Sequence, residues 1–336
     1  MAQNKINTRL KDNPDTGFGT QTTVGGRFVN KDGSFNVKKR GLSYLKRISF
    51  YSYLLEFSWT KFFIFILLFF LLVNLAFTGL YWWNGMEELT GYYSNTYWGR
   101  VRELFYFSTQ TFTTVGYGRI NPVGDVADLI ATAEAMCGWL FFALVTGLLY
   151  GRFVRPKAFV AFSQNALLSP YREGHALMFR MVPYKNIHHM TDVRVVVNVS
   201  FRIGAENLEY KFYQLTLERS RIDTLSMNWT VVHPINEESP LLNFTQTDFQ
   251  TPDLDIEMLV QVTGFDPVFS NQVMARTSYT YEEMVWGAKF IPMYREEGDT
   301  TVLELNKLNV FDKVLLPKPK TAMSNTGNEQ TPVSNR

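Results

Sequence analysis

Residues 101–118 read VRELFYFSTQTFTTVGYG, and this stretch decides the fold. Its first part has helical propensity over about 13 residues, too few to cross a membrane at about 1.5 Å per residue. Its last five residues are Thr114, Val115, Gly116, Tyr117 and Gly118. Glycine at alternate positions permits backbone dihedrals that other residues rarely adopt. A short helix that leads directly into such a loop predicts a re-entrant segment if the flanking sequence spans a membrane.

Two apolar blocks flank this stretch. The first, from Phe62 to Trp83, carries no charge over roughly 22 residues, which is enough to cross a hydrocarbon core of about 30 Å. It predicts an outer membrane helix at about residues 60–83. The second block predicts an inner helix at about residues 126–153 and contains Glu134. A carboxylate in a membrane helix is costly unless it faces protein or water, so we expect Glu134 to be functional or paired.

Basic residues set the orientation of these two helices. They precede the first block at Lys38, Lys39, Arg40, Lys46, Arg47 and Lys61, and they follow the second at Arg152, Arg155 and Lys157. By the positive-inside rule both flanks, and therefore both termini, are cytoplasmic in a multi-pass membrane protein. Residues 43–59 mix aromatic and charged side chains in a pattern compatible with an interfacial slide helix on the inner membrane surface.

The loop itself has the sequence TVGYG, which is the potassium filter sequence. A potassium ion must lose its water, so backbone carbonyls have to replace that shell, and we expect the ion at Thr114, Val115, Gly116 and Tyr117. The pore helix, at about residues 100–112, would direct its partly negative C-terminus at the cavity. One loop cannot surround an ion, so three further identical subunits are expected, in a homotetramer.

Four further stretches resemble the inward rectifier potassium channels, including their bacterial members. They are RFVNKDGSFNV (27–37), GRFVRPKA (151–158), INEESPL (235–241) and ARTSYTYEEMVWGAKFIP (275–292), and the resemblance covers about residues 27–295. It implies a channel in the cell membrane, the inner membrane if the source is bacterial. Apolar segments with Arg or Lys at every third position, typical of voltage sensors, are not found in this sequence, which favours gating by ligand or lipid.

The resemblance also implies roles for residues of the inner helix. Tyr150 is the candidate gate where the four helices cross. Gly138 and Gly147 are either hinges or sites of close packing. Glu134 either supports the filter through the pore helix or is a buried acid that is satisfied locally.

Four basic residues match positions at which this family binds anionic lipid: Lys61, Arg152, Arg155 and Lys157. One interpretation is a site for an anionic phospholipid or a phosphoinositide head group. The other is that these residues only set the topology and contact phospholipids in general.

The chain also departs from the family pattern. Gln110 stands where a pore-helix Glu is usual, and Arg119 follows Gly118 directly. Both are candidate supports of the filter by their positions, but the ion pair that braces the filter in the family is in doubt. Phe142 and Pro267 align with positions that are acidic in strong rectifiers. Strong block by polyamines is therefore not expected.

The cytoplasmic half is expected to be a β-sandwich. Its strand-like runs are residues 176–182, 192–202, 229–235, 256–265 and 275–281, and their spacing suggests antiparallel pairing. The family resemblance implies an immunoglobulin-like domain. The resulting division is a cytoplasmic segment at 1–42, the slide helix at 43–59, the pore domain at 60–156, the β-domain at 157–316 and a disordered tail at 317–336.

Other function classes find little support. A net charge of +2 does not suggest a nucleic-acid partner, and we expect neither an enzyme nor a cofactor, with potassium only as the permeant ion. His188 and His189 are expected at the surface or an interface. Two rivals remain: a potassium uptake subunit, which would show several pore loops in one chain, and a membrane-anchored enzyme or binding module in which TVGYG is incidental.

Overall fold

The computed structural model describes residues 6–7, 12–13, 16–17, 27–41, 43, 49–203, 209–250 and 255–317. The chain divides into two compact units, one of residues 39–155 and one of residues 1–38 with 156–336. Half of the segment expected at 1–42 and nearly all of the tail expected at 317–336 lie outside the described residues, as do residues 44–48 of the slide helix.

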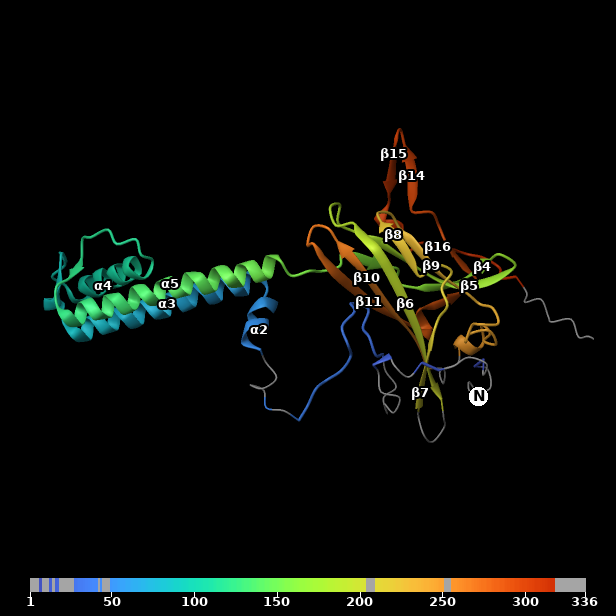
Figure 1. Ribbon diagram of the computed structural model, residues 1–336, viewed down its shortest axis with the longest axis horizontal. Helices are drawn as coiled ribbons and strands as arrows, with labels where there is room; N and C mark the ends of the chain where they lie inside the picture. Colours follow the sequence, from blue (N-terminus) through green and yellow to red (C-terminus); the bar gives the residue numbers. More distant parts are fainter. Residues whose placement is uncertain are drawn as a thin grey trace, which may run out of the picture. The chain divides into compact units, whose positions relative to one another are not determined.

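The helical unit contains two helices that are long and apolar enough to cross a membrane. They are α3 (Trp59–Asn84) and α5 (Asp125–Phe153), within a residue of the ranges expected, and Figure 1 shows them side by side. Leu67, Leu68 and Leu72 of α3 are more than half exposed in the isolated chain, as suits a surface for lipid or other subunits. Both helices are therefore consistent with a membrane protein.

A short helix and a loop connect α3 to α5. The helix α4 (Tyr97–Phe112) begins about three residues earlier than expected, because Thr96 caps it by accepting a hydrogen bond from the Gly99 N–H. Before it lie η3 (Met86–Glu88) and β1 (Leu89–Thr90), and β1 pairs with β2 (Asn121–Pro122). Within the described part of the slide-helix range, α2 covers Phe50–Glu56 and ends before Phe57.

The second unit is a sandwich of two five-stranded sheets. One runs β11 (Asn271–Thr280), β10 (Ile256–Asp266), β6 (Met190–Ile203) and β7 (Glu209–Gln214), with β8 (Arg221–Leu225) also on β6. The other runs β12 (Met284–Trp286), β4 (Ala166–Tyr171), β5 (Gly174–Pro183) and β3 (Val160–Phe162), with β9 (Trp229–Pro234) also on β5. Two small sheets pair β13 (Ala288–Phe290) with β16 (Phe311–Lys313) and β14 (Tyr294–Glu297) with β15 (Thr300–Leu303).

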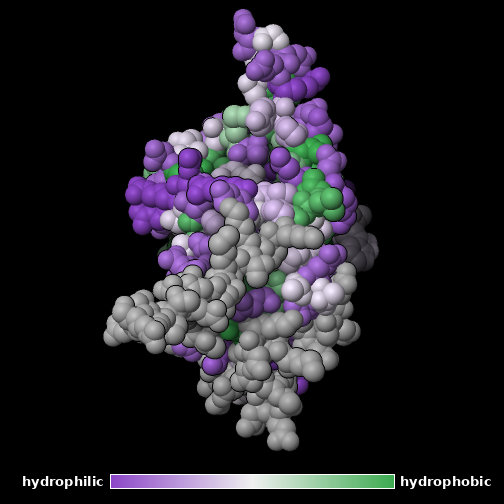
Figure 2. Space-filling view, turned by 90° about the vertical axis from the view of Figure 1, so that its right-hand side faces the viewer, coloured by the Kyte–Doolittle hydropathy of each residue, from purple (hydrophilic) through white to green (hydrophobic). Residues whose placement is uncertain are grey.

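The core between the sheets follows from alternation along the strands. In β6, Val193, Val195, Val197 and Val199 are buried, because every second residue of a strand faces the same side. They pack with apolar residues of the opposite sheet such as Phe179. Figure 2 shows one side of this unit, where the described surface is mainly hydrophilic. A polar surface on this side suits contact with water.

The expectation for this domain holds in class and needs correction in detail. The mostly β fold is confirmed, but β12 and β4 pair in parallel, so the sandwich is not purely antiparallel. Each of the five predicted runs lies mainly in a strand, although Tyr281 belongs to the 3-10 turn η5 (Tyr281–Glu283). The remaining strands were not predicted, since several are only three residues long and carry too few residues for a period to appear.

Candidate functional site

The loop from Thr114 to Gly118 alternates between two backbone conformations. Thr114, Gly116 and Gly118 have φ values of 59°, 53° and 76°, whereas Val115 and Tyr117 lie outside the positive-φ region. Left-handed dihedrals at every second residue turn successive peptide groups the same way, so that carbonyl oxygens can line one path. Glycine adopts this conformation without strain, but at Thr114 it costs about 1–2 kcal/mol, so the surroundings must hold it.

The inner end of the loop is held by the last turn of α4. The Thr114 N–H donates to the Thr111 carbonyl at 3.0 Å, and the N–H groups of Val115 and Gly116 donate to the Gln110 carbonyl at 2.9 and 3.3 Å. Carbonyls in the last turn of a helix lack intrahelical partners, so the loop satisfies them. Gln110, a predicted support residue, therefore contacts the loop through its main chain.

The outer end of the loop carries an ion pair that the sequence left in doubt. Arg119 Nη1 lies 3.0 Å from Oε1 of Glu103, so its acidic partner is Glu103 and not a residue at position 110. We missed Glu103 in the sequence. It lies seven residues before Gln110, about two helical turns, and this spacing places both on one face of α4.

Glu134 lies at the centre of a buried polar cluster between three helices. Its carboxylate accepts hydrogen bonds from the Tyr81 hydroxyl at 2.7 Å and from the Ser108 hydroxyl, and Glu134 is fully buried. Ser108 also lies 3.1 Å from Oδ1 of Asn74. The contact with α4 fits the interpretation as a filter support, and the hydroxyl donors equally fit an acid that is satisfied locally.

The two glycines of α5 have different surroundings. A Cβ atom added to Gly138 would lie 1.8 Å from the carbonyl oxygen of Phe112, whereas one added to Gly147 would meet no atom within 4 Å. Gly138 therefore allows α5 to approach the C-terminus of α4, which favours close packing over a hinge at this position. Tyr150, the candidate gate, is 68% exposed in the single chain.

The four basic residues expected to bind lipid are not equivalent. The Arg152 guanidinium donates to the carbonyls of Leu54 and Phe57 at 2.8 and 2.6 Å, so it is bound by the end of α2. Its role at an anionic lipid stays a prediction, and the hydrogen bonds show only that its guanidinium also holds α2. Arg155 is largely exposed, and its contact with the Glu56 carboxylate is long, at 3.9 Å. Lys61 is exposed. Lys157 belongs to the β unit, where it lines a cavity of about 620 Å³.

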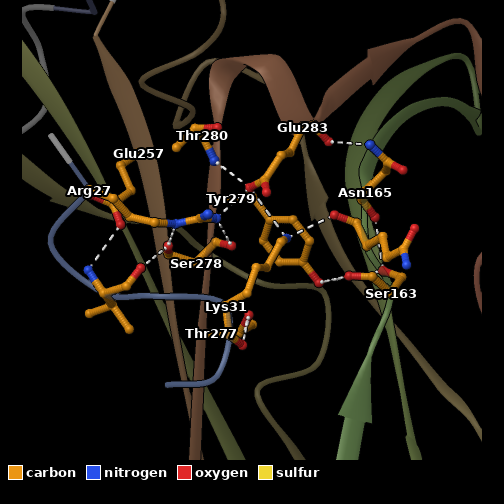
Figure 3. Close-up of polar contacts among 12 residues, drawn as sticks. Arg27, Lys31, Ser163, Asn165, Glu257, Thr277, Ser278, Tyr279, Thr280 and Glu283 are labelled. Atoms are coloured by element: carbon orange, nitrogen blue, oxygen red, sulfur yellow. Dashed lines mark hydrogen bonds and ion pairs between the residues drawn. The ribbon is translucent and has the colours of Figure 1, made fainter. Parts of the chain in front are cut away.

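The N-terminal segment is joined to the β unit by an unpredicted charge cluster (Figure 3). Arg27 Nη2 lies 2.5 Å from Oε2 of Glu283, and Lys31 Nζ lies 3.3 Å from the same atom. Lys31 also stands over the Tyr279 ring at 3.6 Å and donates to the Gln164 carbonyl. Burial lowers the pKa of Lys31 to about 8, against the opposing effect of the Glu283 carboxylate.

A second acid, Glu257, binds the main chain of the same segment. Its carboxylate accepts the N–H groups of Phe28 and Val29 at 2.6 and 3.2 Å, and the Ser278 hydroxyl donates to the Val29 carbonyl at 2.5 Å. Burial raises the pKa of Glu257, although the hydrogen bonds from the main chain oppose that shift. Residues 27–31 are thus a bound part of the β unit, as Figure 3 shows.

The histidines do not form a metal site. His188 is half-buried, with Nδ1 2.7 Å from Oδ2 of the buried Asp266 and its ring centre 4.4 Å from that of Phe159, so it is partly covered within the β unit. The alternative expectation, a position at an interface, stays a prediction. His189 is exposed. Within the described part of the chain, no group of three or more His, Cys, Asp or Glu side chains could hold a metal ion.

Comparisons with known proteins agree with both units. Residues 160–330 match the inward rectifier potassium channel C-terminal domain, and residues 68–155 match the ion channel family. The inward rectifier potassium channel Kirbac3.1 of Paramagnetospirillum magnetotacticum is 34% identical over 287 residues, which is 84% of this chain and 95% of that protein. The ATP-sensitive inward rectifier potassium channel 12 of Mus musculus is 27% identical over 208 residues, 57% of this chain and 47% of the relative.

Proposed function

The chain belongs to the inward rectifier potassium channels, and we propose on this basis that its TVGYG loop is the selectivity filter of a homotetramer. The families and relatives that it matches are ion channels rather than enzymes, and potassium is its permeant ion. The protein is a membrane protein, and we propose that it lies in the cell membrane with both termini cytoplasmic.

The alternation of φ along the loop carries this proposal. Positive φ at Thr114, Gly116 and Gly118 is the conformation that a row of carbonyl ligands requires, and it occurs between two spanning helices. Carbonyls of Thr114, Val115, Gly116 and Tyr117, with the Thr114 hydroxyl, would replace the hydration shell of the ion. Four loops around one axis would complete each ring of ligands.

Three groups of contacts support the filter. The Gln110 carbonyl holds its inner end, Arg119 lies at its outer end, and the Glu134 cluster joins the pore helix to both spanning helices. Because α4 ends beside the loop, its partly negative C-terminus would also favour a cation in the cavity. A rigid filter of this kind would select potassium over the smaller sodium ion.

Gating is proposed at Tyr150, with anionic lipid as the regulator. Arg155, Lys61 and Lys157 are exposed cations that could meet a lipid head group, whereas Arg152 is held by α2. Gly147 stays the candidate hinge, because a Cβ added there would meet no atom within 4 Å and close packing in the single chain therefore does not require a glycine. Rectification is proposed to be weak.

Weak rectification is supported by uncharged residues at two aligned positions, one in the cavity and one in the cytoplasmic pore. Phe142 and Pro267 stand at the two aligned acidic positions, and neither can attract a polyamine by charge. Block by spermine should therefore depend only weakly on the membrane voltage.

The first test measures potassium and sodium flux into liposomes with and without a phosphoinositide. We expect barium-sensitive potassium flux that Gly116→Asp abolishes, because the new side chain occupies the filter at a φ of 53°. Gly298→Asp is the matched control, since Gly298 also has positive φ, at 60°, in the exposed turn between β14 and β15. Selective flux in Gly116→Asp, or none in the wild type under any lipid condition, would favour the anchored binding module instead.

A further inference from the structure

We propose that Glu103 is the positioning residue that holds the outer end of the selectivity filter, acting through Arg119. This inference rests on the proposed function of the TVGYG loop. It assigns the role of a filter brace to a residue two turns away from the position at which the family pattern places an acid.

The Glu103 carboxylate accepts hydrogen bonds from the residue after the filter and from the segment before α4. Oε1 lies 3.0 Å from Nη1 of Arg119, and Oε2 accepts the N–H groups of Tyr93 and Ser94 at 3.1 and 3.3 Å. Glu103 is 7% exposed. A buried carboxylate needs such partners, and charged hydrogen bonds are the strong ones, so this group joins α4, the segment before it and the residue after the filter.

The main chain of Arg119 is held just as closely. A Cβ atom added to Gly91 would lie 1.6 Å from the Arg119 carbonyl oxygen, so the two backbones are in direct contact. The next residues pair with β1, Asn121 with Thr90 and Pro122 with Leu89. Arg119 therefore has little freedom to move without the loop that precedes it.

One hydrogen bond connects this fixed segment to the last residue of the filter. The Asn121 side-chain amide donates to the Gly118 carbonyl at 2.9 Å, which orients the outermost carbonyl of the loop. Gly118 is left-handed, with a φ of 76°, and a glycine has no side chain to restrict it. The outer end of the filter thus depends on its neighbours for its shape, whereas the inner end is bound directly by α4.

Position 103 can take this role because of the period of the helix. Seven residues make about two turns, so Glu103 and Gln110 share one face of α4, while Glu103 lies about 10 Å further along the axis. Gln110 is neutral and binds the inner loop through its carbonyl. An acid at Glu103 therefore meets the cation after the filter without disturbing the contacts at the inner end.

The test compares potassium-to-sodium flux ratios in proteoliposomes for Glu103→Gln, Arg119→Gln, the double variant and Arg119→Lys. Glu87→Gln is the matched control, because it removes the same charge from an exposed site before the same loop. Heat resistance of the tetramer is measured in parallel. We expect each single variant to lower the ratio about tenfold, ~1.4 kcal/mol, and the double variant to lower it no further, because the residues act as a unit.

Arg119→Lys keeps the cation and should retain most of the selectivity, and Glu87→Gln should not differ from the wild type. A wild-type ratio in Glu103→Gln, losses that multiply in the double variant, or an equal loss in Glu87→Gln would overturn the brace while leaving the filter proposal standing. A tetramer that loses heat resistance at an unchanged ratio would also overturn it, because the role would then be structural only. Absence of selective flux in the wild type would instead defeat the proposed function.

Discussion

Arg152 offers the sharpest test of how the inner helix α5 is joined to α2. Its guanidinium donates to the carbonyls of Leu54 and Phe57 at 2.8 and 2.6 Å, at the C-terminal end of α2, and stacks 4.6 Å from the ring centre of Trp59. These carbonyls lack partners within α2, and the positive charge also suits a helix C-terminus. Lysine at this position would keep the charge but could not span both carbonyls.

The magnitude follows from the lost contact. A hydrogen bond from a charged group contributes about 1.5–3 kcal/mol, so Arg152→Lys should weaken the attachment of α2 by about 2 kcal/mol, or about 30-fold. A helix of seven residues is not stable alone, so detachment of α2 exposes its amides. Hydrogen–deuterium exchange of residues 53–56, whose amides are bonded within the helix, should therefore accelerate about 30-fold in Arg152→Lys in the full channel.

Arg155→Lys is the matched control, because Arg155 is largely exposed and its contact with Glu56 is long, at 3.9 Å. Exposed pairs contribute less than about 1 kcal/mol, so exchange of α2 should change little. Unchanged exchange of α2 in Arg152→Lys would refute the attachment. If potassium flux in that variant then needed more anionic lipid, the lipid interpretation of Arg152 would be supported.

Two further predictions concern packing and pH. Gly138→Ala should lower the heat resistance of the tetramer, because its Cβ would lie 1.8 Å from the Phe112 carbonyl, and Gly147→Ala should not; equal losses would contradict the packing assigned to Gly138. Because burial lowers the pKa of Lys31 from 10.5 to about 8, the unfolded chain binds more protons between these values, so this group adds stability as pH rises through that window. The unfolding temperature of wild type minus that of Lys31→Met should accordingly increase from pH 8 to pH 10.5, and a constant difference would count against a buried Lys31.

The local sequence pattern was sufficient to predict the elements whose structure depends on neighbouring residues. The spanning helices were visible because a membrane demands about 20 apolar residues in a row, and α3 and α5 begin and end within a residue of the expected ranges. The loop was visible because its glycines stand at 116 and 118, where the backbone adopts positive φ. The main strands were visible from alternation, as in β6.

Prediction was incomplete where a residue's contacts depend on a partner distant in the chain. Arg152 was assigned to lipid from the family resemblance, and nothing in the sequence indicated its contacts with Leu54 and Phe57, which lie 98 and 95 residues away. Glu103 was not identified from the sequence, because a single charged residue on a short helix has no local pattern that indicates its role. Only its position beside Arg119 gives it a function.

By itself the sequence determined the membrane spans, the place of the TVGYG loop between them, the β-rich class of the second unit and the channel family. Each of these is set by length, period or a contiguous motif, which are properties of neighbouring residues. Only the tertiary structure decided which hydrogen-bond donors the buried acidic side chains meet. Glu134 accepts from Tyr81, 53 residues away, and Glu257 accepts from the amides of Phe28 and Val29. The reason is physical, because a buried charge needs a partner but its own sequence neighbourhood does not specify which distant helix or strand will supply one.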